Sequence, residues 1–117
     1  MNLSMQHLKS FLLTTLFLLC SLNAKASSVD TKAAVLAKQN ACLGCHAVDK
    51  KIVGPSFQAI AKKYTNDPSA QVFLKNKILK GGSGSWGVVP MPANTKLNDA
   101  DLSTLASWIL RGAPNKN

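Results

Sequence analysis

Two cysteines, Cys42 and Cys45, are separated by only two residues and are followed directly by His46. This cluster constrains the fold because it lies in a short chain. We expect residues 1–26 to be removed, and residues 27–117 can build only a thin hydrophobic core. A domain of that size usually needs a disulfide, a metal or a large cofactor for stability. A disulfide between such close neighbours would contribute little, so we expect another stabilising group.

The spacing Cys-x-x-Cys-His is the attachment signature of c-type haem. The thiols of Cys42 and Cys45 can form thioethers with the two vinyl groups of one porphyrin, and the imidazole of His46 then faces the iron. One short peptide would fix the position of the ring, its orientation and one axial ligand. The sequence therefore predicts one covalently attached haem c.

Two other readings of the cluster are open at this point. A thioredoxin-like redox pair needs strands around it in a βαβ unit, and the sequence shows no strand pattern. A structural zinc site needs four ligands, whereas residues 27–117 hold no Cys or His beyond Cys42, Cys45 and His46. Both alternatives are therefore disfavoured relative to haem.

The first residues have the pattern of a secretory signal peptide. Lys9 belongs to a short basic start, residues 11–22 are mostly apolar, and residues 24–26 form a small-x-small cleavage site. The apolar run is well short of the roughly 20 residues that span a bilayer. A lipoprotein signal at Cys20 is the alternative, but Leu19 stands where such a signal has a small residue. We expect a periplasmic protein with no membrane anchor after cleavage.

Apolar residues at helical spacing predict four helices in the domain 27–117. They cover residues 29–41, residues 57–64, a segment from Pro68 to the glycines at 81–82, and a segment from the cap Asn98 to Gly112. The fold class predicted is all-α with long loops. The residues that carry this pattern in the first three helices are Val29, Ala33, Leu36, Ala37, Phe57, Ile60, Ala61, Tyr64, Val72, Leu74, Ile78 and Leu79. In the last helix we expect Leu102, Leu105, Ala106 and Ile109 to form the buried stripe with Trp108 beside it, and we expect Trp108, Leu105 and Tyr64 to belong to the core.

Residues 81–97 show neither the apolar spacing of a helix nor that of a strand, yet they include Trp86 and Met91. An apolar loop of this length needs something to lie against. Met91 is the only Met after residue 26, and the prolines at 90 and 92 hold its backbone stiffly. A core Met is usually a gap filler, but this setting favours a sulfur ligand to haem iron. With His46 and Met91 on the iron, we expect electron transfer and no enzymatic activity; a haem protein that binds ligands or acts as a peroxidase, with a displaceable Met91, is the alternative.

Positive charge dominates the chain. The formal net charge is +9, and it is +7 once Lys9 and Lys25 are subtracted; there is no Glu. Such an excess favours acidic partners and speeds encounter with them. Nucleic acid is disfavoured because the lysines are scattered, Arg111 is the only Arg, and the chain is expected to be exported.

These features together resemble the short bacterial class I cytochromes c. The resemblance covers residues 29–112 and rests on the Cys-x-x-Cys-His motif, on residues 53–55 (Val-Gly-Pro), on the glycine-rich stretch with Trp86, and on Pro-Met-Pro at 90–92. It implies four to five helices around one haem with an exposed edge. It also implies a monomeric, soluble carrier of single electrons in respiration or denitrification, between an upstream cytochrome complex and a reductase, oxidase or peroxidase.

The resemblance also suggests roles for individual residues. The carbonyl of Pro55 would accept a hydrogen bond from His46 and fix its tautomer. Trp86 and Lys77 would contact a haem propionate, and the side chain of Asn94 would lie near the sulfur of the axial Met. The competing readings are ordinary packing for Trp86, a solvated side chain for Lys77 and a turn residue for Asn94.

Overall fold

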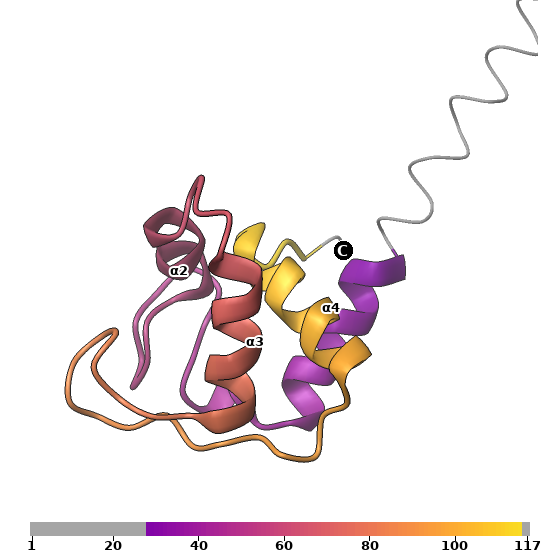
Figure 1. Ribbon diagram of the computed structural model, residues 1–117. Coiled ribbons are helices and arrows are strands. Elements are labelled where there is room, and N and C mark those ends of the chain that lie inside the picture. The colour runs from indigo at the N-terminus through magenta and orange to yellow at the C-terminus, as the bar shows by residue number, and fades with distance from the viewer. Residues whose placement is uncertain (1–27, 116–117) are drawn as a thin grey trace, which may run out of the picture.

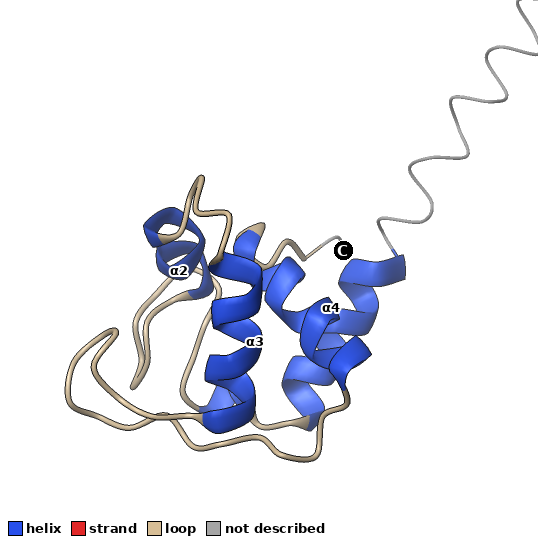
Figure 2. Ribbon diagram, viewed as in Figure 1, coloured by secondary structure: helices blue, strands red, loops and turns tan. Residues whose placement is uncertain are grey.

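The computed structural model describes residues 28–115. In this part the chain forms helices joined by long loops and no strand (Figures 1 and 2). The elements are an N-terminal helix ending at residue 39, a short 3-10 turn η1 (Cys42–Gly44), and the helices α2 (Phe57–Lys63), α3 (Ala70–Lys80) and α4 (Asp99–Leu110). The all-α prediction is confirmed. The predicted signal peptide and its cleavage site lie outside the described residues.

Helix α4 organises the core because it packs against both α2 and α3. Its predicted stripe is buried throughout, at 8% exposure or less: Leu102, Leu105, Ala106, Trp108 and Ile109. The indole N–H of Trp108 donates to the carbonyl oxygen of Pro114 at 3.2 Å, so this buried aromatic leaves no polar atom unpaired. None of the helices in residues 28–115 is both long and apolar enough to cross a bilayer.

Both ends of α4 follow from the sequence. The side chain of Asn98 accepts a hydrogen bond from the backbone N–H of Asp101 at 2.9 Å, which caps the first turn. At the other end, Gly112 adopts a left-handed conformation with φ 83°. The N–H groups of Gly112 and Ala113 then bond back to Ile109 and to the residue before it, as in a Schellman motif. The predicted cap and stop are confirmed.

The N-terminal helix buries a narrower face than the sequence predicted. Ala33 and Ala37 are fully buried, but Val29, which was predicted on the same helix face, is 44% exposed. Asp30 turns inward instead and forms a 2.5 Å ion pair with Arg111, just after α4. The ion pair joins the start of this helix to the end of α4.

Val72, one of the apolar residues of the predicted third helix, lies on its exposed face. The buried face of α3 consists of Ala70, Leu74 and Ile78, which recur every four residues. Val72 lies two residues from Leu74, about 200° around the helix, and is 62% exposed. The predicted segment contained apolar residues on both faces, and the packing against α4 selects one of them.

Two predicted boundaries shift by a few residues. The helix expected over 29–41 ends at residue 39, because Ala41 adopts a left-handed conformation with φ 57°. The third helix begins at Ala70 rather than at Pro68, because the side chain of Asp67 accepts hydrogen bonds from the backbone and hydroxyl of Ser69 and holds a separate turn.

The loop of residues 81–97 swings outward from the end of α3 and returns beneath it to α4 (orange in Figure 1). Gly82 and Met91 pair through two backbone hydrogen bonds of 2.9 and 3.0 Å, which pinch the loop at its base. A little further on, the N–H of Asn94 donates to the carbonyl oxygen of Ile78 at 3.0 Å. This loop and the segment that carries Cys42 to His46 both line one pocket.

Candidate functional site

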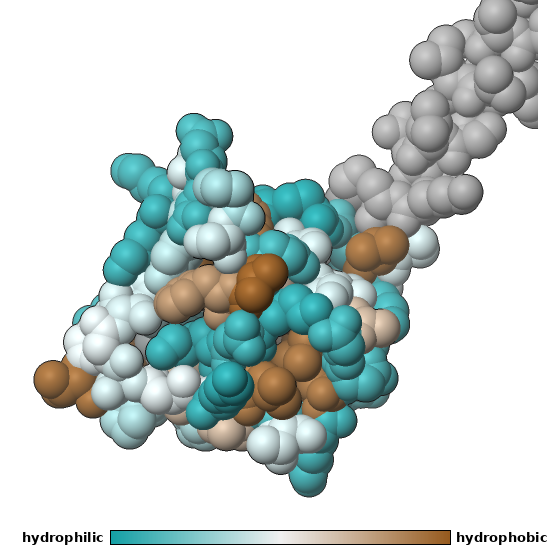
Figure 3. Space-filling view, viewed as in Figure 1, coloured by the Kyte–Doolittle hydropathy of each residue, from teal (hydrophilic) through white to brown (hydrophobic). Residues whose placement is uncertain are grey.

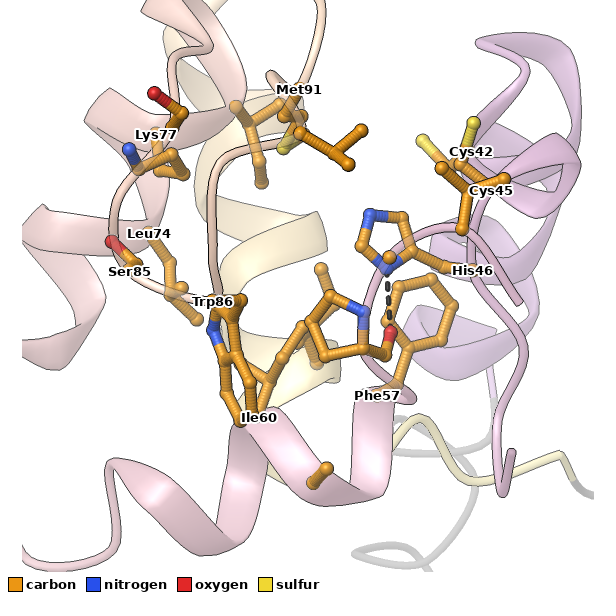
Figure 4. A pocket seen from close by; sticks show the side chains of 18 of the residues that line it. Cys42, Cys45, His46, Phe57, Ile60, Leu74, Lys77, Ser85, Trp86 and Met91 are labelled. Atoms are coloured by element: carbon orange, nitrogen blue, oxygen red, sulfur yellow. Dashed lines mark hydrogen bonds between the residues drawn. The ribbon is translucent and has the colours of Figure 1, made fainter. Parts of the chain in front are cut away.

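The pocket has a volume of about 460 Å³, within the ~300–1,000 Å³ usual for cofactor and ligand sites. Its walls are mostly apolar and come from all the helices and from the 81–97 loop. Figure 4 shows the labelled side chains that converge on it. Seven of the eight site residues predicted from the sequence line this pocket: Cys42, Cys45, His46, Pro55, Lys77, Trp86 and Met91.

A tight turn presents the two thiols and the imidazole together. After the left-handed Ala41, η1 bends the chain so that the N–H groups of Cys45 and His46 both donate to the carbonyl of Cys42, at 3.2 and 3.0 Å. In Figure 4 the two sulfur atoms and the ring of His46 lie on one side of the pocket. Both cysteines are free thiols and half-buried.

Burial raises the pKa of the Cys42 thiol above that of an ordinary cysteine. A nucleophilic thiol in a disulfide oxidoreductase needs the opposite shift, toward the thiolate. Among residues 28–115, no three His, Cys, Asp or Glu side chains are placed to hold a metal ion together. The geometry therefore offers support to neither the thioredoxin-like nor the zinc reading.

The ring of His46 is held on three sides. Its Nδ1 lies 2.7 Å from the carbonyl oxygen of Pro55. A carbonyl can only accept, so in the neutral ring Nδ1 carries the proton and Nε2 keeps a free lone pair. The ring of Phe57 stacks on the imidazole at 5.4 Å between centroids and 18° between planes. Nε2 points into the pocket (Figure 4), so it is presented as a ligand.

Gly54 completes the seat of His46. A Cβ atom added at Gly54 would lie 2.5 Å from Cε1 of the imidazole, closer than real Cβ contacts come. The backbone N–H of Gly54 also donates to the carbonyl of Cys45 at 2.8 Å. Only a residue without a side chain lets the chain pass this close to the ring.

Met91 faces these groups from the other side of the pocket (Figure 4). It is half-buried, and its backbone N–H and carbonyl are both bonded to Gly82. A side chain at Gly81 would collide with the carbonyl of Met91, so the absence of a side chain at Gly81 permits this close approach. Met91 is therefore fixed by the bridge to Gly82 as well as by the prolines beside it.

The remaining predicted residues differ in their placement. Lys77 is half-buried and Trp86 is 44% exposed; both lie on the same side of the pocket as Ser85 in Figure 4. Trp86 therefore does not belong to the hydrophobic core of the described chain. Asn94 does not line the pocket, and its predicted contact with the sulfur of Met91 stays a prediction.

Three contributors were not predicted: Gly54, Phe57 and Lys63. Gly54 lies inside the Val-Gly-Pro motif, and Phe57 follows Pro55 by two residues. Both could have been found by asking which residues must fit beside His46. The ammonium of Lys63 lies 4.5 Å from the centroid of the Trp86 ring. Nothing in the sequence separates Lys63 from the lysine before it.

The side chains present fit haem c. Two thiols adjoin an imidazole whose free nitrogen faces the cavity, a thioether lies opposite, and the walls between them are apolar. Cys42, Cys45 and His46 match the attachment chemistry, and Met91 matches a second axial ligand in softness and position.

Comparison with known proteins agrees with this site. The family model for cytochrome c matches residues 31–113. Cytochrome c-552 of Nitrosomonas europaea is 49% identical over 75 residues, which cover 64% of this chain and 73% of that protein. The crystal structure of wild-type Nitrosomonas europaea cytochrome c552 matches with a TM-score of 0.65 and 48% identity, covering 68% of this chain and 98% of that one. The class 1 cytochrome MtoD of Sideroxydans lithotrophicus matches with a TM-score of 0.63 and 28% identity, over 72% and 96% of the two chains. This chain belongs to the cytochrome c family, among its small class I members, which are monohaem electron carriers with covalently bound haem c.

Proposed function

We propose that this chain is a soluble carrier of single electrons in the bacterial periplasm, with His46 and Met91 as the two axial ligands of its haem. The observation that carries the proposal is the placement of these two side chains on opposite walls of one apolar pocket, with both thiols beside His46. The signal-like residues 1–26 support export. The role is that of a carrier rather than an enzyme.

Each residue of the site then has a definite task. Cys42 and Cys45 would hold the porphyrin covalently, and the carbonyl of Pro55 orients His46 so that Nε2 would be the donor atom. The thioether of Met91 favours the reduced metal and raises the reduction potential. When bound, haem c supplies a ferric–ferrous couple that gains and loses one electron. The apolar walls would keep water from the couple, and His46 and Met91, once both bound, would leave no place for a substrate at the iron.

Carbon monoxide tests this function against the ligand-binding or peroxidase-like alternative. We expect the purified, reduced protein to show no spectral change for minutes after carbon monoxide is added, because Met91 is fixed by its two bonds to Gly82. Prompt formation of a carbon monoxide complex would mean that Met91 is displaceable, and it would favour the alternative.

The surface around the pocket suggests how a partner docks. Lys51 and Lys77 line the pocket, and apolar side chains surround its mouth: Val53 is 52% exposed, Val88 90% and Val89 63%. Figure 3 shows a largely hydrophilic face with apolar atoms at the outer end of the 81–97 loop. We expect an acidic-surfaced redox protein to be steered by the lysines and to make contact over the apolar residues.

Salt dependence tests the steering. Stopped-flow electron transfer to an acidic redox protein should slow as ionic strength rises from low to physiological values, because screening shortens the reach of the lysines. A matched experiment with a basic redox protein should show the opposite trend. If the rate with the acidic partner did not depend on salt, the lysines would have no steering role.

A further inference from the structure

The outer wall of the pocket is the part of the 81–97 loop beyond the Gly82–Met91 pair. Residues 83–90 all line the pocket. Within this stretch Gly84 and Gly87 adopt positive φ values of 97° and 117°, and a hydrogen bond of 2.8 Å from Gly84 N–H to the carbonyl of Gly87 closes the turn. Glycine backbones of this kind are permissive and do not stiffen the wall themselves. Its position depends on contacts with other elements.

One such contact comes from α2. The ammonium of Lys63 donates a hydrogen bond to the carbonyl oxygen of Ser85 at 2.6 Å. The same ammonium lies 4.5 Å from the centroid of the Trp86 ring, within the range of a cation–π contact. Two neighbouring residues of the wall are therefore held by one charged group.

Helix α2 in this way touches both walls of the pocket. Its first residue, Phe57, stacks on His46, and its last residue, Lys63, holds Ser85 and Trp86. The helix has only 7 residues, so the two contacts are coupled through a short rigid element. A movement of the wall away from α2 would open the pocket to water on the side of Trp86.

We propose that Lys63 is a positioning residue that fastens the 81–97 loop over the haem and thereby raises the reduction potential. The inference rests on the proposed function, because it needs haem in the pocket. Closing the wall keeps water from the haem, and a drier site disfavours the more highly charged oxidised form. The positive charge of Lys63 acts in the same direction, since it favours the state with one more electron.

Three variants of the haem-loaded protein test this role. Lys63→Ala removes both contacts, and Lys63→Arg keeps the charge and the capacity for both. Lys62→Ala is the matched control, because it removes the same charge from the adjacent position of α2, where the side chain is exposed. For each variant the midpoint potential is measured by spectroelectrochemistry, and the hydrogen exchange of the amides of residues 83–89 is measured by NMR on the reduced protein.

We expect Lys63→Ala to speed exchange in residues 83–89 by roughly fivefold or more. At a fixed applied potential, the ratio of reduced to oxidised Lys63→Ala protein should fall by roughly two- to fivefold. This corresponds to a midpoint potential lower by about 20–40 mV for a one-electron couple. Lys62→Ala and Lys63→Arg should stay close to wild type in both measurements.

Several results would overturn the proposal. Equal behaviour of Lys63→Ala and Lys62→Ala would show that Lys63 acts only as one surface charge among others. A lower potential without faster exchange would show that the wall does not move. If Lys63→Arg did not keep the wild-type midpoint potential and exchange rates, a contact that depends on positive charge at this position would be excluded. If wild type held no haem at all, the proposed function itself would fail, whereas the other results leave it standing.

Discussion

At the scale of single residues, the site depends on how closely the chain can approach the imidazole of His46. The ring is bonded to Pro55, stacked on Phe57 and passed at close range by Gly54. These contacts fix the orientation of the imidazole ring and its tautomer before any ligand is bound, so Nε2 is held in one direction. A donor atom held in this way needs little rearrangement between two oxidation states.

Gly54→Ala tests the close approach. The added Cβ would meet the imidazole at 2.5 Å, so either the ring or the backbone must move. We expect the haem-loaded protein to lose about 1–3 kcal/mol of stability, measured by guanidinium unfolding. Gly44→Ala is the matched control, because a Cβ there meets nothing within 4 Å. Equal stability of the two variants would mean that the absence of a side chain at Gly54 does not determine the position of the His46 ring.

Met91→Ala tests the second axial ligand. Loss of the thioether should open one axial position, allow prompt carbon monoxide binding in the reduced state, and lower the potential by ~100 mV or more, since axial ligands set potentials over a range of ~0.8 V. Thr95→Ala, at an exposed position of the same loop that does not line the pocket, should change neither property. A wild-type potential in Met91→Ala would exclude Met91 as the ligand.

At the scale of elements, the two ends of the described chain are joined through the ion pair of Asp30 and Arg111. The side chain of Asp30 is only 9% exposed, whereas that of Arg111 is 47% exposed. Removing the arginine would leave a carboxylate buried without its partner, which costs more than the pair itself contributes. The pair therefore closes the N-terminal helix onto the end of α4.

Arg111→Ala should destabilise the haem-loaded protein by about 1–3 kcal/mol, less than a fully buried pair because the arginine is partly solvated. The control is Lys75→Ala, which breaks a pair with Asp99, whose side chain is 83% exposed. That change should cost less than about 1 kcal/mol. Thermal unfolding of both variants measures the difference, and equal losses would show that burial of Asp30 has no special effect.

The helices and the attachment motif could be predicted because their signals are local. Caps, glycine stops and helical spacing act within a few residues, and they placed α4 correctly at both ends. The exposure of Val29 and Val72 could not be predicted, because local spacing does not say which face of a helix meets a neighbour. The contact of Lys63 with Trp86 joins residues 23 positions apart through a loop without periodicity, so only the folded structure reveals it.

At the scale of the whole molecule, the pocket is part of the hydrophobic core. Seven core residues that are buried from solvent also line it: Ala37, Phe57, Ile60, Leu74, Ile78, Leu105 and Ile109. A domain this small has few other apolar contacts to replace those with a bound haem. Stability and cofactor binding are therefore expected to be coupled.

Loss of covalent attachment tests this coupling. Cys42→Ala or Cys45→Ala leaves one thioether, and the double variant leaves none. We expect haem to be lost progressively in guanidinium as attachments are removed, and the haem-free double variant to lose most of its helical circular dichroism. A haem-free protein with full helix content would contradict a core that depends on the cofactor.

The most direct test of the central claim is an optical spectrum of the purified protein, oxidised and then reduced, extended to the far-red region. We predict sharp low-spin bands on reduction, together with a weak far-red sulfur-to-iron band in the oxidised state, which are the features that the proposed ligation by Met91 and His46 would produce. Haem bands without the far-red feature would contradict ligation by Met91. A colourless protein from a host able to attach haem would contradict the whole account and return Cys42 and Cys45 to thiol chemistry.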